Sequence, residues 1–211
     1  MEANIIYNID CLTGLRNLPD DSIDCCVTSP PYFNLRDYGV SGQIGLEDTP
    51  EQYIQKLVGV FHEVRRVLAP AGTLWVNIGD CYAGSGKGAA NYPDNAMKYK
   101  QGTNRGTVGR SAIVKKFDGY KSKDLIGIPW MLAFALRADG WFLRQDIIWA
   151  KPNPMPESMK DRCTKSHEYI FLLTKSPKYY FDCEAIHEKA VTSGTIPTNA
   201  PRYGGNKYTA T

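Results

Sequence analysis

Four consecutive residues could do chemistry on a flat ligand that carries an amino group: Ser29, Pro30, Pro31 and Tyr32. The two prolines fix φ and remove two backbone N–H groups, so the turn keeps a rigid shape. The side chain or carbonyl of Ser29 and the carbonyl of Pro30 are hydrogen-bond acceptors, and the ring of Tyr32 can stack on a planar group. The simpler interpretation is a structural turn with Tyr32 as a surface ring.

An apolar segment, Ile23–Thr28, comes directly before this turn and must position it. Its composition is typical of a strand covered on both faces, as in a parallel α/β sheet. A helical pattern at 49–68 and a second apolar strand at 74–78 then indicate a parallel crossover. Because ligands of open α/β sheets bind beyond the carboxyl ends of the strands, we expect the turn to lie at a ligand-binding edge.

The turn at 29–32 resembles motif IV of the amino-group DNA methyltransferases. Other stretches resemble further segments of that family, in the order of its circularly permuted β group: 8–12, 72–80, 146–156 and 167–171. The resemblance covers most of residues 4–182. It implies a Rossmann-like, S-adenosylmethionine-dependent methyltransferase fold of the α/β class. The sheet would be incomplete and mostly parallel, with an antiparallel strand near one edge.

The resemblance also implies a reaction. A methyl group passes from S-adenosylmethionine to the exocyclic amino group of a base in double-stranded DNA, and the base must flip out of the duplex to react. The four residues of the turn would be catalytic. Ser29 and Pro30 would accept the amino hydrogens and stabilise positive charge on nitrogen, while Tyr32 would hold the base by stacking. No metal is required.

The segment at 8–12 would contact the adenosine of the cofactor, with Asp10 and Cys11 as binding residues. Asp10 also stands where a helix over 11–18 would begin, so capping of that helix is an equally good interpretation. The residues before it, 4–8, have the pattern of a short strand.

The residue at position 29 bears on the target base. In the family, Ser before Pro-Pro-Tyr favours N4 of cytosine, and N6 of adenine is the alternative. Three other functions stay open: a glutamine methyltransferase that acts on protein, an inactive DNA-binding remnant, and one half of a split methyltransferase. The basic segment described below argues against the first of these.

One element of the family pattern is missing from the sequence. The β group carries a Phe-x-Gly-x-Gly segment for the cofactor near its C-terminus, and no such segment is present. The glycine-rich stretch at 84–88 follows a different strand and lacks the Gly-Lys-Ser/Thr of a phosphate loop. We therefore expect that a C-terminal segment or a second chain completes the cofactor site.

Residues 84–123 form a long segment rich in glycine, in which cations outnumber acids and aromatic residues are interleaved. Such a segment suits contact with the DNA backbone and ordering on binding, whereas a solvated insertion is the alternative. The candidate DNA-binding residues are Arg36, Lys87, Arg105, Arg110, Lys115 and Lys116.

The remaining features bound the class of protein. The predicted division is 1–83, 84–123, 124–183 and 184–211, in which the first and third parts make the catalytic domain and the last is a tail or the start of a further part. Asp124 would cap a helix over 124–139. The six cysteines show no zinc spacing, and neither a signal peptide nor a membrane span is evident, so a cytoplasmic protein with reduced thiols is expected. A restriction endonuclease is a possible partner.

Overall fold

The computed structural model describes residues 2, 4–84, 117–154, 156–157 and 159–187. Its contacts divide the chain into residues 1–180 and 181–211, and all helices and strands of the described residues belong to the first unit. They are, in order, α1 (Cys11–Arg16), β1 (Ile23–Thr28), α2 (Pro50–Val67), β2 (Leu68–Ile78), α3 (Ile128–Ala138), β3 (Phe142–Ala150) and β4 (His167–Thr174). None of these helices is long and apolar enough to cross a bilayer.

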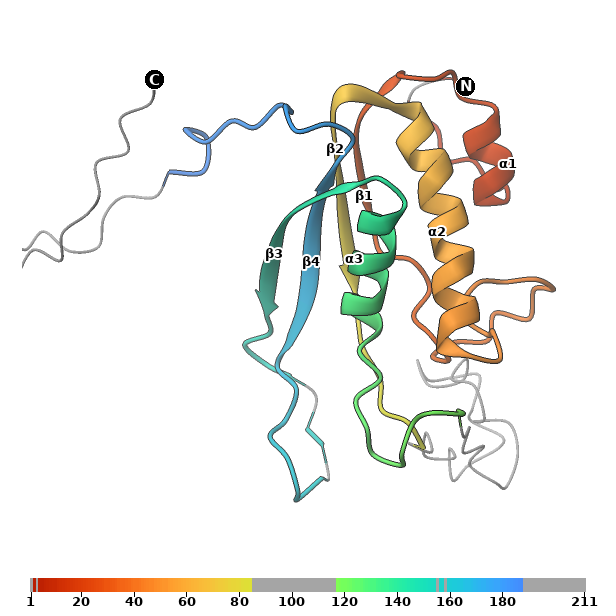
Figure 1. The fold of residues 1–211 in the computed structure, drawn as a ribbon, viewed down its shortest axis with the longest axis vertical. Coiled ribbons are helices and arrows are strands. Elements are labelled where there is room, and N and C mark those ends of the chain that lie inside the picture. The colour runs from red at the N-terminus through yellow and green to blue at the C-terminus, as the bar shows by residue number, and fades with distance from the viewer. Residues whose placement is uncertain (1, 3, 85–116, 155, 158, 188–211) are drawn as a thin grey trace, which may run out of the picture. The chain divides into compact units, whose positions relative to one another are not determined.

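The four strands make one mixed sheet in the order β1-β2-β4-β3 (Figure 1). β1 pairs with β2 in parallel, whereas β4 runs antiparallel to both of its neighbours. Three strands therefore point the same way, and the antiparallel strand lies second from one edge. The predicted α/β class, with an antiparallel strand near an edge, is confirmed. Since β4 separates β2 from β3, only the β1–β2 pairing is itself parallel.

The core lies between the sheet and two helices, α2 and α3, on one of its faces (Figure 1). α2 begins as its sequence predicts, because the hydroxyl of Thr49 accepts from the Gln52 N–H and a proline follows the cap. Its buried stripe includes Leu57 and Phe61. The sheet contributes alternate residues of β2 and β4 to this core, namely Leu74, Val76, Ile78, Phe171 and Leu173.

Helix α3 starts later than its sequence pattern predicts, at Ile128 rather than 124. The carboxylate of Asp80, just beyond β2, accepts from the Gly127 and Ile128 N–H groups at 3.0 Å. Asp124 does not cap the helix, because it accepts from the Lys121 N–H within a preceding turn. The capping prediction was therefore wrong, since a remote carboxylate already satisfies the free N–H groups at this helix start.

Two predictions about the first thirty residues were also wrong. Residues 4–8 are not a strand, because no strand pairs with them in the described chain, and Ile6 is 99% exposed. β1 was expected to be covered on both faces, yet Val27 is 76% exposed. β1 is an edge strand, and among the described residues the helices cover only the opposite face of the sheet.

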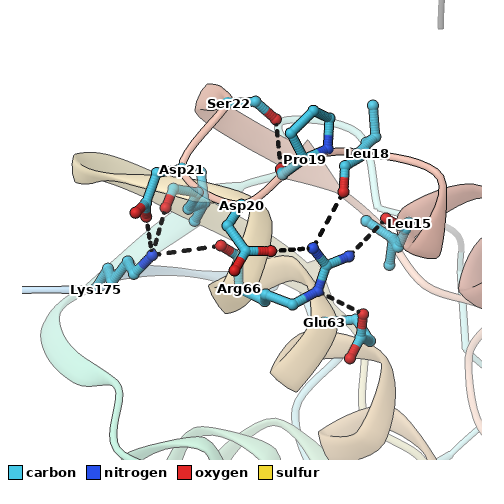
Figure 2. Close-up of polar contacts among 10 residues, drawn as sticks. Leu15, Leu18, Pro19, Asp20, Asp21, Ser22, Glu63, Arg66 and Lys175 are labelled. Atoms are coloured by element: carbon cyan, nitrogen blue, oxygen red, sulfur yellow. Dashed lines mark hydrogen bonds and ion pairs between the residues drawn. The ribbon is translucent and has the colours of Figure 1, made fainter.

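The end of the sheet where β1 begins is fastened by two cations, Arg66 and Lys175 (Figure 2). Arg66 donates to the carbonyls of Leu15 and Leu18 at the end of α1, and pairs with Glu63 and Asp20. Lys175 donates to the carbonyl of Leu68 at 2.7 Å and pairs with Asp21. These contacts tie α1 to α2 and β4 to β2, away from the turn at 29–32.

Candidate active site

The turn at 29–32 lies at the edge of the sheet where β1, β2 and β3 end and β4 begins. The register fixes this arrangement, because Thr28 is opposite Val76 and Ala150 is opposite His167. Ser29 is exposed and Pro30 half-buried, so the turn is open to a ligand rather than enclosed in packing. Its predicted position beyond the carboxyl end of a strand is the position observed.

Two buried aromatic residues hold the turn from the core side. Tyr53 of α2 is fully buried, and its hydroxyl donates to the carbonyl of Pro31 at 2.8 Å. Burial raises the pKa of Tyr53, so the phenol stays a donor. Phe33, which follows the turn, packs on the Tyr53 ring with 5.3 Å between centroids. The hydrogen bond to the Pro31 carbonyl and the packing of the Phe33 ring together therefore fix the turn.

The carbonyl groups of the turn differ in whether they already accept a hydrogen bond. Those of Pro31 and Tyr32 accept from Tyr53 and from the Leu35 N–H. No donor within the described ranges reaches the carbonyl of Pro30. On a rigid backbone, Pro30 thus presents an acceptor that no described donor occupies, and its catalytic role stays a prediction.

Tyr32 is held more firmly than a surface ring. Its hydroxyl lies 2.8 Å from Oε2 of Glu168 and 3.0 Å from Oδ1 of Asn77. Its ring lies against Gly79 so closely that a Cβ atom there would be 2.5 Å from the Tyr32 Cε2. Burial is the main cause that raises the pKa of Tyr32 to about 12. A hydrogen bond with Ser29 lowers this pKa, whereas the carboxylate of Glu168 raises it further.

Asn77 joins Tyr32 to the start of the turn. Its amide donates to the carbonyl of Tyr169 at 3.1 Å, which points Oδ1 toward the hydroxyls of Tyr32 and Ser29. The Ser29 Oγ lies 3.5 Å from that oxygen. The hydrogen bond to Tyr169 therefore fixes the orientation of the Asn77 amide, so that its oxygen faces both hydroxyls.

Glu168 and Lys151 form an ion pair at the same edge of the sheet. The Glu168 side chain is 19% exposed and that of Lys151 is 42% exposed. Burial alone would raise the pKa of Glu168, but hydrogen bonds from Lys151 and Tyr32 outweigh it and lower the pKa below its ordinary value. Glu168 is thus a carboxylate near neutral pH.

The sequence did not assign roles to Asn77, Gly79, Lys151 or Glu168, although all four fall in the stretches that resembled the methyltransferases. The available signal was topological. Residues that follow β2 and β3, or that begin an antiparallel β4, lie at the same edge of the sheet as the end of β1. The contacts of Asn77, Gly79 and Glu168 with Tyr32, and of Lys151 with Glu168, require the register of the sheet, which the sequence does not give.

Asp10 caps α1 as predicted. Its Oδ1 accepts from the Thr13 N–H at 3.0 Å and from the Thr13 hydroxyl at 3.1 Å, and the backbone hydrogen bond is the main cause of its lowered pKa. Cys11 is exposed. No hydrogen bond in the described part of the chain joins either residue to the turn, and their cofactor role stays a prediction.

The predicted DNA-binding residues lie mostly outside the described residues. Arg36 is half-buried in the loop after the turn, and its carbonyl accepts from Gln43. Lys87, Arg105, Arg110, Lys115 and Lys116 fall in the part that the structure does not describe. A hollow of about 420 Å³, lined by Tyr82, Lys123 and Arg162 among others, lies where that part joins the described chain.

The chain is similar to DNA methylases along most of its length. A family profile described as DNA methylase matches residues 23–199. Type II methyltransferase M.Cfr9I of Citrobacter freundii is 52% identical over 189 residues, which are 90% of this chain and 60% of that protein. Type II methyltransferase M.SmaI of Serratia marcescens is 51% identical over 185 residues, which are 86% and 59%. The chain thus spans about 60% of the length of these relatives.

Two solved structures show the same fold at low identity. The PvuII DNA methyltransferase, cytosine-N4-specific, aligns with a TM-score of 0.54 and 17% identity, covering 83% of this chain and 50% of that one. Thermus thermophilus TTHA0409, complexed with S-adenosyl-L-methionine, gives a TM-score of 0.51 and 22% identity, covering 83% and 55%. These likenesses confirm the Rossmann-like architecture of a methyltransferase.

Proposed function

Because the chain belongs to the DNA methylase family, we propose that it methylates the exocyclic amino group of a base flipped out of double-stranded DNA, with S-adenosylmethionine as donor. The observation that carries the proposal is the carbonyl of Pro30, which accepts from no donor of the described residues, on a rigid turn next to a tyrosine ring whose position is fixed. A planar amino-bearing ligand is what this arrangement recognises.

The residues of the turn would act by accepting hydrogen bonds. The amino group is a poor nucleophile, since its lone pair is delocalised into the base. Two fixed acceptors, the Pro30 carbonyl and the Ser29 hydroxyl, would favour a more localised lone pair and stabilise positive charge as the N–C bond forms. When bound, S-adenosylmethionine would supply the electrophilic methyl group. One proton of the methylated amino group would then pass to solvent.

Tyr32 would hold the base by stacking, and Pro31 would keep the turn stiff. The contribution of Tyr32 is mainly positioning, because methyl transfer needs the nitrogen in line with the departing sulfur. Its fixed hydroxyl and its contact with Gly79 support this role.

We propose N4 of cytosine as the target, on the basis of Ser29. N6 of adenine is the alternative. The protein, as its gene encodes it, is incubated with unmethylated DNA and the cofactor, and digested nucleosides are analysed by mass spectrometry. N4-methylcytosine is the expected product, and N6-methyladenine alone would contradict the choice of base but not the class of reaction. Methyl transfer to protein without DNA would instead indicate a glutamine methyltransferase.

The cofactor would contact Asp10 and Cys11, with a further segment or a second chain completing its site. In the part of the chain that the structure describes, no strand pairs with the outer edge of β1, and Ile6 and Val27 are exposed. Both features support this, because unpaired strand edges and apolar side chains are normally covered. Calorimetric titration of S-adenosylmethionine would compare the 211-residue chain alone with the same chain fused to the C-terminal part of M.Cfr9I. Tight binding only in the fusion is expected; equal binding in both would contradict the need for completion.

DNA would be contacted by the basic residues Arg36, Lys87, Arg105, Arg110, Lys115 and Lys116. If they neutralise phosphates, affinity falls steeply with salt, and each Lys→Ala or Arg→Ala change reduces the slope of log K against log salt by about one. DNA binding of this kind without any cofactor binding would instead indicate an inactive remnant. A restriction endonuclease partner stays a prediction.

A further inference from the structure

We infer that Glu168, held in turn by Lys151, is a positioning residue that fixes the ring of Tyr32 for the target base. The inference rests on the proposed function. It concerns residues 168 and 151, which come from β4 and from the end of β3 and have no position in the turn itself.

The number of protons and acceptors at the Tyr32 hydroxyl favours Glu168 as its main hydrogen-bond acceptor. A phenol has one proton, and two acceptors lie within reach, Glu168 at 2.8 Å and Asn77 at 3.0 Å. The carboxylate is the closer acceptor and the charged one, and hydrogen bonds to charged groups are about twice as strong as neutral ones. Asn77 is then left to the Ser29 hydroxyl.

The ion pair keeps the carboxylate in place for this task. Lys151 binds Oε1 of Glu168, and Tyr32 binds Oε2, so the two oxygens serve different partners. Glu168 is the second residue of β4, and Lys151 directly follows β3, where its N–H donates to the carbonyl of Ser166 at 2.7 Å, so the pair is held at the adjoining ends of two paired strands. A carboxylate held on rigid elements holds the phenol equally rigidly.

The opposite side of the ring is closed by backbone. Gly79 leaves space for the ring only because it has no Cβ, and its φ is not in the left-handed region. The ring is therefore confined between Gly79 and the Glu168 carboxylate. Ser29, at the start of the turn, is exposed, so the confinement of the ring leaves the site open on that side.

Single-turnover methyl transfer tests the inference. The protein is used as its gene encodes it, and it is present in excess over the DNA. Tyr32→Phe keeps the ring but removes the hydroxyl, and Glu168→Ala removes its acceptor. We expect each to slow transfer by about ten- to a hundredfold, as a misplaced reactant does. The double variant should be no slower than the slower single variant, since both substitutions remove the same contact between Tyr32 and Glu168.

Two further variants keep the test decisive if Glu168→Ala folds poorly. Glu168→Gln retains an oxygen that can accept the phenol proton and should recover most of the lost rate. Lys151→Met keeps the Glu168 side chain but removes its ion pair, and should give an intermediate rate. Effects that multiply in the double variant, or a Glu168→Ala protein with an unchanged rate, would overturn the inference.

Asp21→Ala is the matched control, because it also removes the acid of a lysine pair, at the other end of the sheet. Its rate should equal that of the wild type, whatever its effect on the thermal midpoint. If it slows transfer as much as Glu168→Ala does, the effect is general destabilisation and the inference fails. If the wild-type protein transfers no methyl group at all, the proposed function itself fails.

Discussion

At the scale of single residues, the site depends on how little room surrounds Tyr32. Its hydroxyl is bound by two side chains and its ring touches backbone at Gly79. Asn77 and Gly79 come from the end of β2 and Glu168 comes from the start of β4, so a change at either strand end moves the same ring. Side chains that act on substrate through a fixed geometry are sensitive to shifts of about 1 Å.

Gly79→Ala should therefore lower activity more than it lowers stability. The new Cβ would lie 2.5 Å from the Tyr32 Cε2, and the half-buried ring has to move away. We expect single-turnover methyl transfer to fall about tenfold or more. The control is Gly59→Ala in α2, where nothing lies within 4 Å of the added Cβ. That variant should gain about 0.5–1 kcal/mol in the free energy of unfolding with urea and keep its rate.

Tyr53→Phe tests the second support of the turn. It removes the only hydrogen bond found to the Pro31 carbonyl from the described residues, while the buried ring keeps its packing. The free energy of unfolding should fall by about 0.5–1.5 kcal/mol, the usual net value of one hydrogen bond. Urea unfolding measures this, and a fall in methyl transfer larger than the fall in the folded fraction would show that the turn has also shifted.

The lowered pKa of Glu168 predicts a dependence of stability on pH. Because the pKa is lower in the folded than in the unfolded protein, the contribution of Glu168 is fully present above its unfolded value near 4.5 and is lost as the pH falls through the folded value. Urea unfolding of wild type and Glu168→Gln between pH 7 and pH 3 should therefore show a difference that shrinks toward acid. A constant difference would contradict the ion pair as its cause.

At the scale of elements, the sequence predicted those whose signals are local. α2 carries its own cap, proline and apolar stripe, and β2, β3 and β4 carry apolar runs bounded by turns. The start of α3 was misplaced because its cap is Asp80, 47 residues earlier than Gly127 along the chain. Residues 4–8 and β1 were misjudged for a related reason, since burial depends on what covers a segment and not on its composition alone.

Asp80→Ala should destabilise the protein through the start of α3. Its carboxylate accepts from three backbone N–H groups, of Cys81, Gly127 and Ile128. Loss of a capping side chain lowers the free energy of unfolding by about 0.5–2 kcal/mol, and urea unfolding measures it. Asp124→Ala is the matched control and should have the smaller effect, because that residue accepts from a single turn N–H. The reverse order would contradict the remote cap.

At the scale of the whole molecule, the order of strands explains why the candidate site could be foreseen only in part. The turn at 29–32 was readable because its four residues are adjacent in sequence. Its surroundings were not, because Asn77 reaches it through the pairing of β1 with β2, and Lys151 and Glu168 reach it only after β4 inserts between β2 and β3. The same order leaves β1 at an edge and one face of the sheet without a helix in the described chain.

That open face predicts how the 211-residue chain behaves in solution. Val27 projects from the edge strand and is 76% exposed, and an exposed apolar edge strand is a template for association. We expect the chain to self-associate in sedimentation velocity, and Val27→Lys to shift it toward the monomer without lowering its thermal midpoint. Val40→Lys is the control, since Val40 is 64% exposed but lies outside the strands. Equal effects of both changes would mean that added charge, and not the edge of β1, controls association.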